Sequence, residues 1–432
     1  MRVIKHSDPD FKSSLEAVVN RASLDLVTHD GVVREILEQV KQHGDTALQK
    51  YTKRFDGHTL PLDKIKITHD EIDDARSQVG DLELDALNQA AGNIRKFHER
   101  QIQQSWEYEE DGVLLGQNQR PLEIAGIYVP GGKASYPSSV LMNAIPAKVA
   151  GVEKVIMCCP VPEGKWSAHV LVAAEIAGVD SIFKVGGAQA VGAMAYGTRT
   201  IPKVDKIVGP GNTFVALAKR MVFGIVDIDM IAGPSEILIL ADDDAHADFI
   251  AADLLSQAEH DEEAVPILVT PSEKLAHAVT KELEEQAGRL SRQLIIKECL
   301  DKQCRIFIVE SLKKAIKIAN DIGPEHLELA VTDPHTCAGQ IKNAGAIFLG
   351  HYTPEAIGDY FAGPSHVLPT SGTARFSSPL GVYDFIKRTS IISYSLEALK
   401  KAAPSVSLLA EMEQLDAHAN AVNLRIKRDF GR

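Results

Sequence analysis

The spacing of apolar residues changes twice along the chain. Up to about residue 105 it is helical: Val32-Val-Arg-Glu-Ile-Leu-Glu-Gln-Val40 has an apolar stripe, and residues 82–103 form a long polar helix with one apolar side. From about residue 120, short apolar runs alternate with helical segments. After about residue 380 short helices return. The pattern therefore predicts a helical beginning, a mixed centre and a helical end.

The central region predicts strands that are each followed by a turn containing Gly or Pro, with helices between them. The first series of strands is expected at residues 123–129, 154–159, 181–185, 206–208 and 226–231. The second series is expected at residues 236–240, 266–269, 294–297, 305–309, 327–331 and 346–349. Alternating strands and helices are typical of parallel sheets covered on both faces. The chain is therefore predicted to be an α/β protein with two Rossmann-like lobes and a cleft between them.

These patterns divide the chain into four predicted parts. A mainly helical N-terminal segment at 1–120 packs on the lobes, and the lobes follow at 121–234 and 235–380. A small helical tail at 381–432 contains short helices at residues 395–401, 405–415 and 417–427. The tail is too small for a large core of its own, so we expect it to pack on another surface, such as a partner subunit.

Composition narrows the classes of partner. The net charge is −13, with 46 Lys and Arg against 59 Asp and Glu and no basic run, which argues against nucleic acid. The first ten residues lack an apolar core, so no secretory signal is expected, and no apolar stretch is long enough to span a bilayer. Five cysteines without framework spacing indicate reduced thiols and a cytoplasmic protein.

The segment Gly323-Pro-Glu-His326 places a carboxylate beside an imidazole at the entrance of an apolar strand. Pro324 disfavours helix at Gly323, so the chain turns there and enters the strand extended. A Glu and a His in contact can divide acid and base work between them. The alternative for this dipeptide is a solvated pair at a strand end.

Candidate metal ligands lie in two segments. Gln257 and His260 are three residues apart near the end of a predicted helix and point the same way. Imidazole nitrogen is a common zinc ligand, whereas an amide oxygen is an unusual one. Asp359 lies in a loop rich in Gly and Pro that also contains His351 and His366. A polar helix end and a solvated loop are the alternatives.

Three turns rich in glycine follow predicted strands of the first series: Tyr128-Val-Pro-Gly131-Gly132, Gly186-Gly187-Ala-Gln189 and Gly209-Pro-Gly211-Asn212. The last opens a helix, which suits a phosphate at a helix N-terminus. The dinucleotide pattern GxGxxG is absent, however, so each turn alone also fits a purely structural role.

Several of these segments recur, in this order, in one enzyme family. Over residues 128–418 the chain resembles the histidinol dehydrogenases, which oxidise L-histidinol through L-histidinal to L-histidine in two NAD-dependent steps of histidine biosynthesis. The matching segments are Val185-Gly-Gly-Ala-Gln-Ala-Val-Gly192, Val208-Gly-Pro-Gly-Asn212, Ile231-Ala-Gly-Pro-Ser-Glu236, Gln257-Ala-Glu-His-Asp261, Gly323-Pro-Glu-His326, Gly358-Asp-Tyr360, His366-Val-Leu-Pro369 and Leu415-Asp-Ala-His-Ala-Asn-Ala-Val422.

The resemblance implies a role for each matching position. It implies Glu325 and His326 as the acid–base pair, and one Zn²⁺ per subunit held by Gln257, His260, Asp359 and His418. It implies NAD contacts from Tyr128, Gln189 and Asn212. Substrate contacts are implied for Ser235, His326, Glu413 and the four zinc ligands, with Glu411 as an alternative to Glu413. It further implies a homodimer whose sites are shared between subunits.

The residue types suit this chemistry. A histidine has the appropriate ordinary pKa to take the hydroxyl proton of the alcohol, and Glu325 is placed to activate the water that adds to the aldehyde. Zinc would act mainly as a template for the substrate. Two alternatives are a zinc-dependent amidohydrolase or peptidase, in which Glu325 activates a metal-bound water, and a non-enzymatic binding protein with two lobes. Formation of NADH from histidinol distinguishes the dehydrogenase from both.

Overall fold

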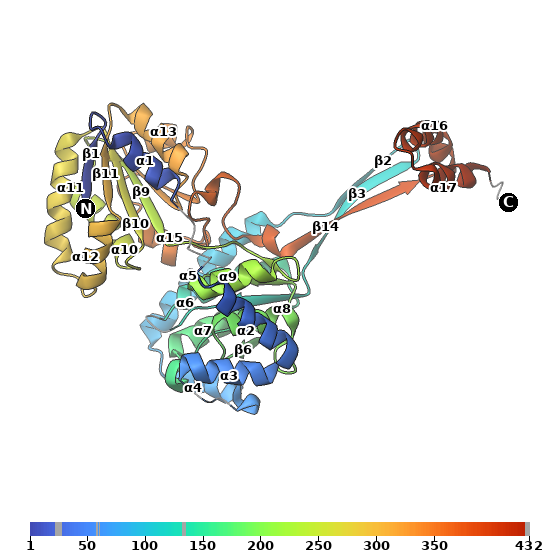
Figure 1. Ribbon diagram of the computed structural model, residues 1–432, viewed down its shortest axis with the longest axis horizontal. Coiled ribbons are helices and arrows are strands. Elements are labelled where there is room, and N and C mark those ends of the chain that lie inside the picture. The colour runs from blue at the N-terminus through green and yellow to red at the C-terminus, as the bar shows by residue number, and fades with distance from the viewer. Residues whose placement is uncertain (22–27, 58, 60, 132–134, 428–432) are drawn as a thin grey trace. The chain divides into compact units, whose positions relative to one another are not determined.

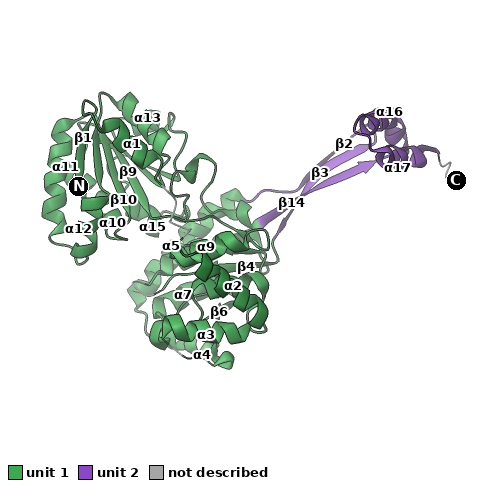
Figure 2. Ribbon diagram, in the orientation of Figure 1, with its two compact units in different colours: residues 1–101, 122–385 green, residues 102–121, 386–432 purple. Residues whose placement is uncertain are grey.

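The computed structural model describes residues 1–21, 28–57, 59, 61–131 and 135–427 (Figure 1). The chain forms two compact units, residues 1–101 with 122–385 and residues 102–121 with 386–432 (Figure 2). The first unit contains a five-stranded and a six-stranded sheet, both parallel throughout. The predicted α/β class with two Rossmann-like lobes is therefore confirmed.

The first lobe is built on the five-stranded sheet, in the order β6-β5-β4-β7-β8. Its strands are β4 (Ile124–Tyr128), β5 (Lys154–Cys158), β6 (Ser181–Phe183), β7 (Lys206–Val208) and β8 (Asp227–Ile228). The connecting helices are α6 (Pro137–Ala150), α7 (Ala168–Ala177), α8 (Gly187–Tyr196) and α9 (Thr213–Val222). The N-terminal helices that pack on these are α2 (Asp30–His43), α3 (Asp45–Asp56), α4 (His69–Ser77) and α5 (Asp81–His98).

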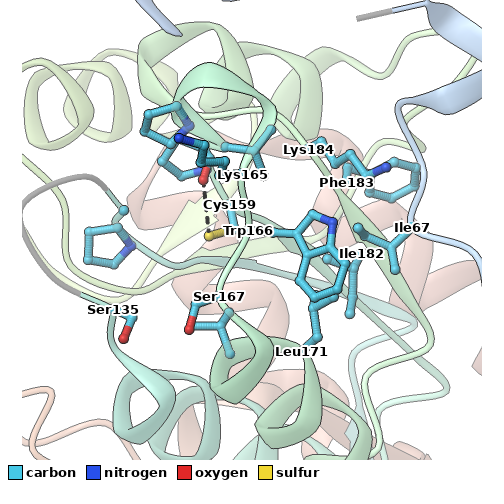
Figure 3. A pocket seen from close by; sticks show the side chains of 16 residues that line it. Ile67, Ser135, Cys159, Lys165, Trp166, Ser167, Leu171, Ile182, Phe183 and Lys184 are labelled. Atoms are coloured by element: carbon cyan, nitrogen blue, oxygen red, sulfur yellow. Dashed lines mark hydrogen bonds between the residues drawn. The ribbon is translucent and has the colours of Figure 1, made fainter. Parts of the chain in front are cut away.

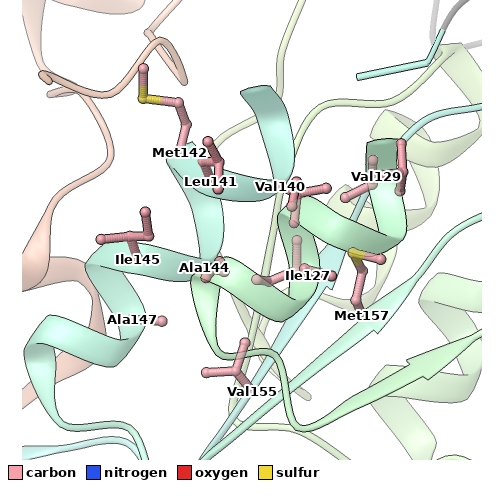
Figure 4. Close-up of a cluster of buried hydrophobic side chains, with 14 of the residues drawn as sticks. Ile127, Val129, Val140, Leu141, Met142, Ala144, Ile145, Ala147, Val155 and Met157 are labelled. Carbon is pink, nitrogen blue, oxygen red and sulfur yellow. The ribbon is translucent and has the colours of Figure 1, made fainter. Parts of the chain in front are cut away.

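Side chains of this sheet alternate between two cores. Ile156 and Cys158 of β5 pack with helices α2, α3, α8 and α9 on one face. Val155 and Met157 pack on the other face with α4, α5, α6 and α7, where Ile127 joins them (Figure 4). Because successive strand residues point to opposite faces, a continuous apolar run is needed to bury both.

The second lobe is built on the six-stranded sheet, in the order β1-β11-β10-β9-β12-β13. Its strands are β1 (Arg2–Lys5), β9 (Glu236–Ala241), β10 (Val265–Thr270), β11 (Arg305–Ile308), β12 (His326–Ala330) and β13 (Ala346–Leu349). Its helices are α1 (Phe11–Val19), α10 (Ala247–Ala258), α11 (Glu273–Ala287), α12 (Gln293–Lys302), α13 (Leu312–Ile322), α14 (Pro334–Ala338) and α15 (Glu355–Tyr360).

Two sequence predictions fail in this lobe. Residues 294–297 were predicted as a strand but lie in helix α12, because a short apolar run does not by itself distinguish a strand from a buried helix. Within the N-terminal segment, predicted as mainly helical, strand β1 was not predicted; it pairs in parallel with β11 at the edge of the sheet. That pairing joins residues about three hundred positions apart, which local spacing does not reveal.

The second unit contains an antiparallel sheet in the order β14-β3-β2, formed by β2 (Trp106–Glu110), β3 (Val113–Pro121) and β14 (Ile386–Tyr394). Two helices follow, α16 (Leu396–Met412) and α17 (Asp416–Lys427). The helices predicted at residues 395–401 and 405–415 are a single helix that contains Pro404. Strand β14 was not predicted. It is stabilised by its long antiparallel pairing with β3, which lies far away in the sequence, so local spacing does not reveal it.

Short 3₁₀ turns complete the described elements, at Leu62–Lys64, Glu99–Gln101, Pro162–Gly164, Thr373–Arg375 and Val382–Phe385. All five cysteines are free thiols. Among the described residues, no helix has both the length and the apolar character that a membrane crossing requires.

Candidate functional site

The three glycine-rich turns of the first lobe meet around Tyr128, the last residue of β4. The hydroxyl of Tyr128 accepts a hydrogen bond from the Gly187 N–H, at 3.0 Å. Gly209 has a φ of +112°, and a Cβ there would lie 2.1 Å from the Tyr128 carbonyl oxygen. The turns after β6 and β7 therefore both touch the end of β4, as expected at the carboxyl edge of a parallel sheet.

A buried ion pair holds the Gly209 turn on both sides. The Gly209 N–H donates to Asp229 Oδ2 at 2.7 Å, while Lys219 Nζ donates to the Gly209 carbonyl at 2.8 Å. The side chains of Lys219 and Asp229 also pair with each other and are almost fully buried. Asn212 then caps helix α9 by accepting from the Val215 N–H. The turn is therefore rigid before any ligand arrives.

Gln189, the third candidate nucleotide contact, is buried in helix α8 just beyond Gly187. Neither its amide nitrogen nor its amide oxygen has a hydrogen-bond partner in the described part of the chain. Buried amides are nearly always satisfied, so this one is available to a ligand. Gly132, in the turn after β4, lies outside the described residues.

A cavity of about 350 Å³ lies at the same edge of the first lobe (Figure 3). Its wall is mainly apolar and includes Pro130, Pro160, Trp166 and Phe183. Cys159 also lines it, but burial raises the pKa of this thiol to about 12, so it is not a thiolate at neutral pH. This cavity was not predicted from the sequence, because Trp166 and Phe183, which line it, belong to no recognisable motif.

The candidate acid–base pair, Glu325 and His326, lies in the second lobe, at the amino end of its strands. Gly323 ends helix α13 with a φ of +58°, and β12 begins directly at His326. The neighbouring strand β9 begins at Glu236. The Glu236 N–H donates to Glu325 Oε2 at 2.8 Å, and the Glu236 carbonyl lies 2.9 Å from His326 Nδ1. One residue of β9 thus holds both members of the predicted pair through its backbone.

The second of these bonds decides the tautomer of His326. A carbonyl oxygen only accepts, so Nδ1 carries the proton and Nε2 is left as the basic nitrogen. Nε2 is buried without a hydrogen-bond partner, 3.6 Å from Asp359 Oδ1. His326 is therefore oriented with its basic nitrogen toward the segment that contains Asp359.

Carboxylates surround this imidazole and shift its titration. Burial alone lowers the pKa of His326, but the charges of Glu355, Glu325 and Asp359 outweigh it and hold that pKa well above the ordinary value. Burial raises the pKa of Glu325 and that of Glu355 to about 8. The site therefore holds more buried carboxyl groups than it has cations to balance them, which is typical of functional sites.

A cluster of potential metal ligands adjoins the pair. His260, Glu355 and Asp359 offer ligand atoms that all lie within 4.8 Å of one another. Gln257 is fully buried, and its amide nitrogen, assigned from hydrogen bonding, lies 3.0 Å from Glu355 Oε1. Three of the four predicted ligands are thus brought together, as α10 ends where the strands begin.

Glu355 was not among the residues predicted for the site from the sequence. It is buried, and its Oε2 has no hydrogen-bond partner in the described residues. Glu355 and Asp359 are four residues apart on helix α15 and therefore share one face of it. That spacing was a usable signal, hidden by the reading of the segment as a loop.

Further residues support the cluster from behind. The Glu355 N–H donates to Glu328 Oε1 at 2.7 Å, and the His366 ring bonds the Asp359 carbonyl through Nδ1 at 2.9 Å. The Nε2 of His366 lies 3.3 Å from Ser139 Oγ. Both ends of the short helix α15 are therefore fixed.

The remaining predicted site residues, Ser235, Glu413 and His418, lie on other segments of the chain. Ser235 directly precedes β9 and accepts a backbone bond from the Val265 N–H. Glu413 ends helix α16 and His418 lies in the first turns of α17; both are exposed and belong to the second unit. Their proposed part in the site stays a prediction.

Two parallel-sheet lobes, with glycine-rich turns on one and a buried cluster of carboxyl and imidazole groups on the other, are typical of an α/β enzyme. A model of the histidinol dehydrogenase family matches residues 19–426. Histidinol dehydrogenases of Syntrophotalea carbinolica and Bacillus cereus are 53% and 50% identical to this chain, and each match covers 99% of it and 99% and 100% of the relative. The crystal structure of histidinol dehydrogenase from Elizabethkingia anophelis is 38% identical, with a TM-score of 0.93 over 99% of this chain and 98% of that one.

The chain belongs to the histidinol dehydrogenase family. Membership assigns it to the oxidoreductases and to histidine biosynthesis. The resemblance inferred from short motifs is thereby confirmed across the whole chain.

The raised pKa of Glu325 predicts a pH-dependent stability. Its ordinary value is near 4.5 and its folded value about 8, so the native state binds more protons between these limits and stability falls as pH rises through them. Glu325→Gln removes this titration. In EDTA-treated protein, the free energy of unfolding of the variant, taken relative to that of wild type, should rise by on the order of 3 kcal/mol between pH 5 and pH 9.

Urea unfolding at several pH values measures this difference. Glu284→Gln, a change at an exposed carboxylate of α11, controls for the loss of one charge. A constant difference between Glu325→Gln and wild type over the whole range would contradict the assignment.

Proposed function

We propose that this protein is a zinc-dependent, NAD-linked histidinol dehydrogenase. It oxidises L-histidinol through L-histidinal to L-histidine, a four-electron oxidation in two steps. Family membership supports the substrate. The observation that supports the chemistry is the pair of hydrogen bonds by which the Glu236 backbone binds Glu325 and His326. The cluster of His260, Glu355 and Asp359 lies beside them. As an enzyme of amino-acid biosynthesis, the protein is expected to work in the cytoplasm.

His326 acts as the base of the alcohol oxidation. Its Nδ1–H is held by the Glu236 carbonyl. With a divalent cation balancing the neighbouring carboxylates, the pKa of His326 would fall, and the unprotonated Nε2 would take the hydroxyl proton as hydride leaves the carbon. Glu355 Oε1, 3.6 Å from Nδ1, stabilises the imidazolium that results. The carbonyl fixes the ring and the carboxylate favours its charged form, much as in other histidine bases oriented by an acidic partner.

Glu325 acts in the aldehyde oxidation. Its Oε2 is bound to the Glu236 N–H, which leaves Oε1 to take a proton from the water that adds to the aldehyde. The resulting hydrate can lose hydride, as the free aldehyde cannot. Burial of both residues keeps bulk water away from the aldehyde between the two steps.

The residues present fit a zinc ion. Gln257, His260 and Asp359 would hold it with His418, and Glu355 Oε2 lies buried beside them without a hydrogen-bond partner in the described chain. A divalent cation would balance the excess of buried carboxyl groups and lower their pKa values. When bound, zinc supplies a template that orients the amino and imidazole nitrogens of the substrate.

The residues of the first lobe fit NAD. Tyr128, Gln189 and Asn212 lie at or next to the turns that meet at the carboxyl edge of the sheet, and the amide of Gln189 has no partner among the described residues. NAD supplies the hydride acceptor for both oxidations. The chain's own part is to hold the nucleotide on rigid turns.

A homodimer would complete each site. The second unit exposes apolar side chains at Leu408, Leu409, Met412 and Leu424, each more than half accessible. Exposed apolar surface of this kind marks an interface. We propose that the tail of one subunit serves the other, so that His418 and Glu413 enter the partner's site.

Metal analysis together with an NADH assay tests the enzyme assignment. The protein with zinc and NAD should form NADH from L-histidinol, followed at 340 nm. His260→Ala should lose bound zinc, measured by atomic absorption, along with turnover, while NAD binding is retained. His277→Ala, an exposed histidine of α11, serves as control and should keep both. Full turnover in demonstrably metal-free protein would refute the role of zinc.

Glu325→Gln separates the two oxidations. Only the aldehyde step needs an activated water, so the variant should lose roughly 10²-fold or more in that step and much less in the alcohol step. Single-turnover oxidation of histidinal and of histidinol, each supplied directly, measures the two. Equal losses would point to a structural role for Glu325 instead.

Mixed dimers test the shared site. His326→Ala and His418→Ala chains, each nearly inactive, are unfolded together and refolded. Random pairing makes half of the dimers mixed, and half of their sites combine an intact core with an intact tail, so about a quarter of wild-type activity should return.

The control mixes His326→Ala with Glu325→Gln, two lesions of the same core, which cannot restore any site. If His326→Ala and His418→Ala heterodimers form but no activity returns, His418 serves its own subunit.

A further inference from the structure

The side chain of Glu236, whose backbone binds Glu325 and His326, forms an ion pair with Arg21. The carboxylate of Glu236 is 2% exposed and accepts two bonds from Arg21, from Nε to Oε1 and from Nη2 to Oε2, each at 2.6 Å. The Ser371 N–H adds a third bond to Oε1, at 2.9 Å. Two parallel bonds between a guanidinium and a carboxylate fix the direction of the side chain as well as its position.

Arg21 also binds the segment that leads to the catalytic pair. Its Nη1 donates to the carbonyl of Ile322 at 3.1 Å and to that of Val18 at 2.9 Å. Ile322 is the last residue of α13 and stands directly before Gly323-Pro324-Glu325. The guanidinium therefore ties the start of β9 to the turn that precedes β12.

These bonds form a continuous path to the reacting groups. Arg21 fixes the Glu236 side chain, and the Glu236 backbone binds Glu325 Oε2 through its N–H and His326 Nδ1 through its carbonyl. A shift of Glu236 would move both catalytic side chains together. Errors of about 1 Å in such positions can cost about a hundredfold in rate.

We propose that Arg21 is a positioning residue for Glu325 and His326, and that it acts through Glu236. The inference rests on the proposed roles of these two residues in histidinol oxidation. Arg21 itself touches neither of them, and its planar fork is the feature that matters. Lysine, with a single charged nitrogen, cannot reproduce two parallel bonds.

The competing explanation is that Arg21 and Glu236 only stabilise the second lobe. In that case substitution would lower the melting temperature but leave kcat of the folded protein unchanged. The two explanations therefore differ in kcat, in its dependence on His326, and in the effect of lysine.

The test measures kcat and KM for histidinol and for histidinal at saturating zinc, with metal content checked. Arg21→Met should lower kcat for both substrates by about 10- to 100-fold, with KM for NAD within about twofold of wild type. The kcat of Arg21→Lys should fall between that of Arg21→Met and that of wild type. Arg2→Met, which breaks the exposed pair of Arg2 with Asp10, is the matched control and should keep wild-type kcat.

A double-mutant cycle gives the decisive reading. In the alcohol step, where His326 is the proposed base, adding Arg21→Met to His326→Gln should lower the single-turnover rate by less than about threefold further, because residues that act through one another are not additive. A full additional loss, or an unchanged kcat in Arg21→Met, would overturn the proposal. If wild type forms no NADH from histidinol, the proposed function itself has failed, which is a separate result.

A further variant covers loss of folding. Arg21→Met leaves the buried Glu236 carboxylate without its Arg21 partner, whereas Arg21→Met/Glu236→Gln removes the charge of both members of the pair. The double variant should fold and show the same fall in kcat. A folded double variant with wild-type kcat would overturn the proposal.

Discussion

The two hydrogen bonds made by the Glu236 backbone are the constraint on which the site depends. At the first position of a parallel strand, the N–H and carbonyl groups are not both committed to the sheet ladder. Here they bind the carboxylate of Glu325 and the imidazole of His326. Because the backbone belongs to a buried strand, both side chains take on the rigidity of the sheet.

This arrangement explains the placement of the acid–base site. Ligands of open α/β sheets usually bind at the carboxyl ends of the strands, and the glycine-rich turns of the first lobe lie at that edge of their sheet. In the second lobe the amino ends of β9 and β12 carry the site. Helix α10 runs back along the sheet, so Gln257 and His260 at its end reach the same edge.

The excess of buried carboxyl groups shapes the rest of the chemistry. Asp253 and Glu328 are hydrogen-bonded, and burial raises the pKa of both. Glu355 and Glu325 lie nearby, with His326 as the imidazole between them. Such a group of carboxyls is unfavourable without a cation, because like charges in a buried site resist ionisation together. A metal ion would therefore contribute to stability as well as to catalysis.

Apolar spacing alone determined that this is a two-lobed α/β protein, because parallel strands buried on both faces must be continuously apolar. The ordered motifs around Gln257, His326 and Asp359 identified the family. Only the tertiary structure revealed that Glu355 is buried beside His260 and Asp359, that Arg21 pairs with Glu236, and that β1 and β14 are strands. Each of these depends on contacts between residues far apart in the chain, or on a burial that removes a polar atom from water. Local spacing contains neither kind of information, and the sheet registers decide both.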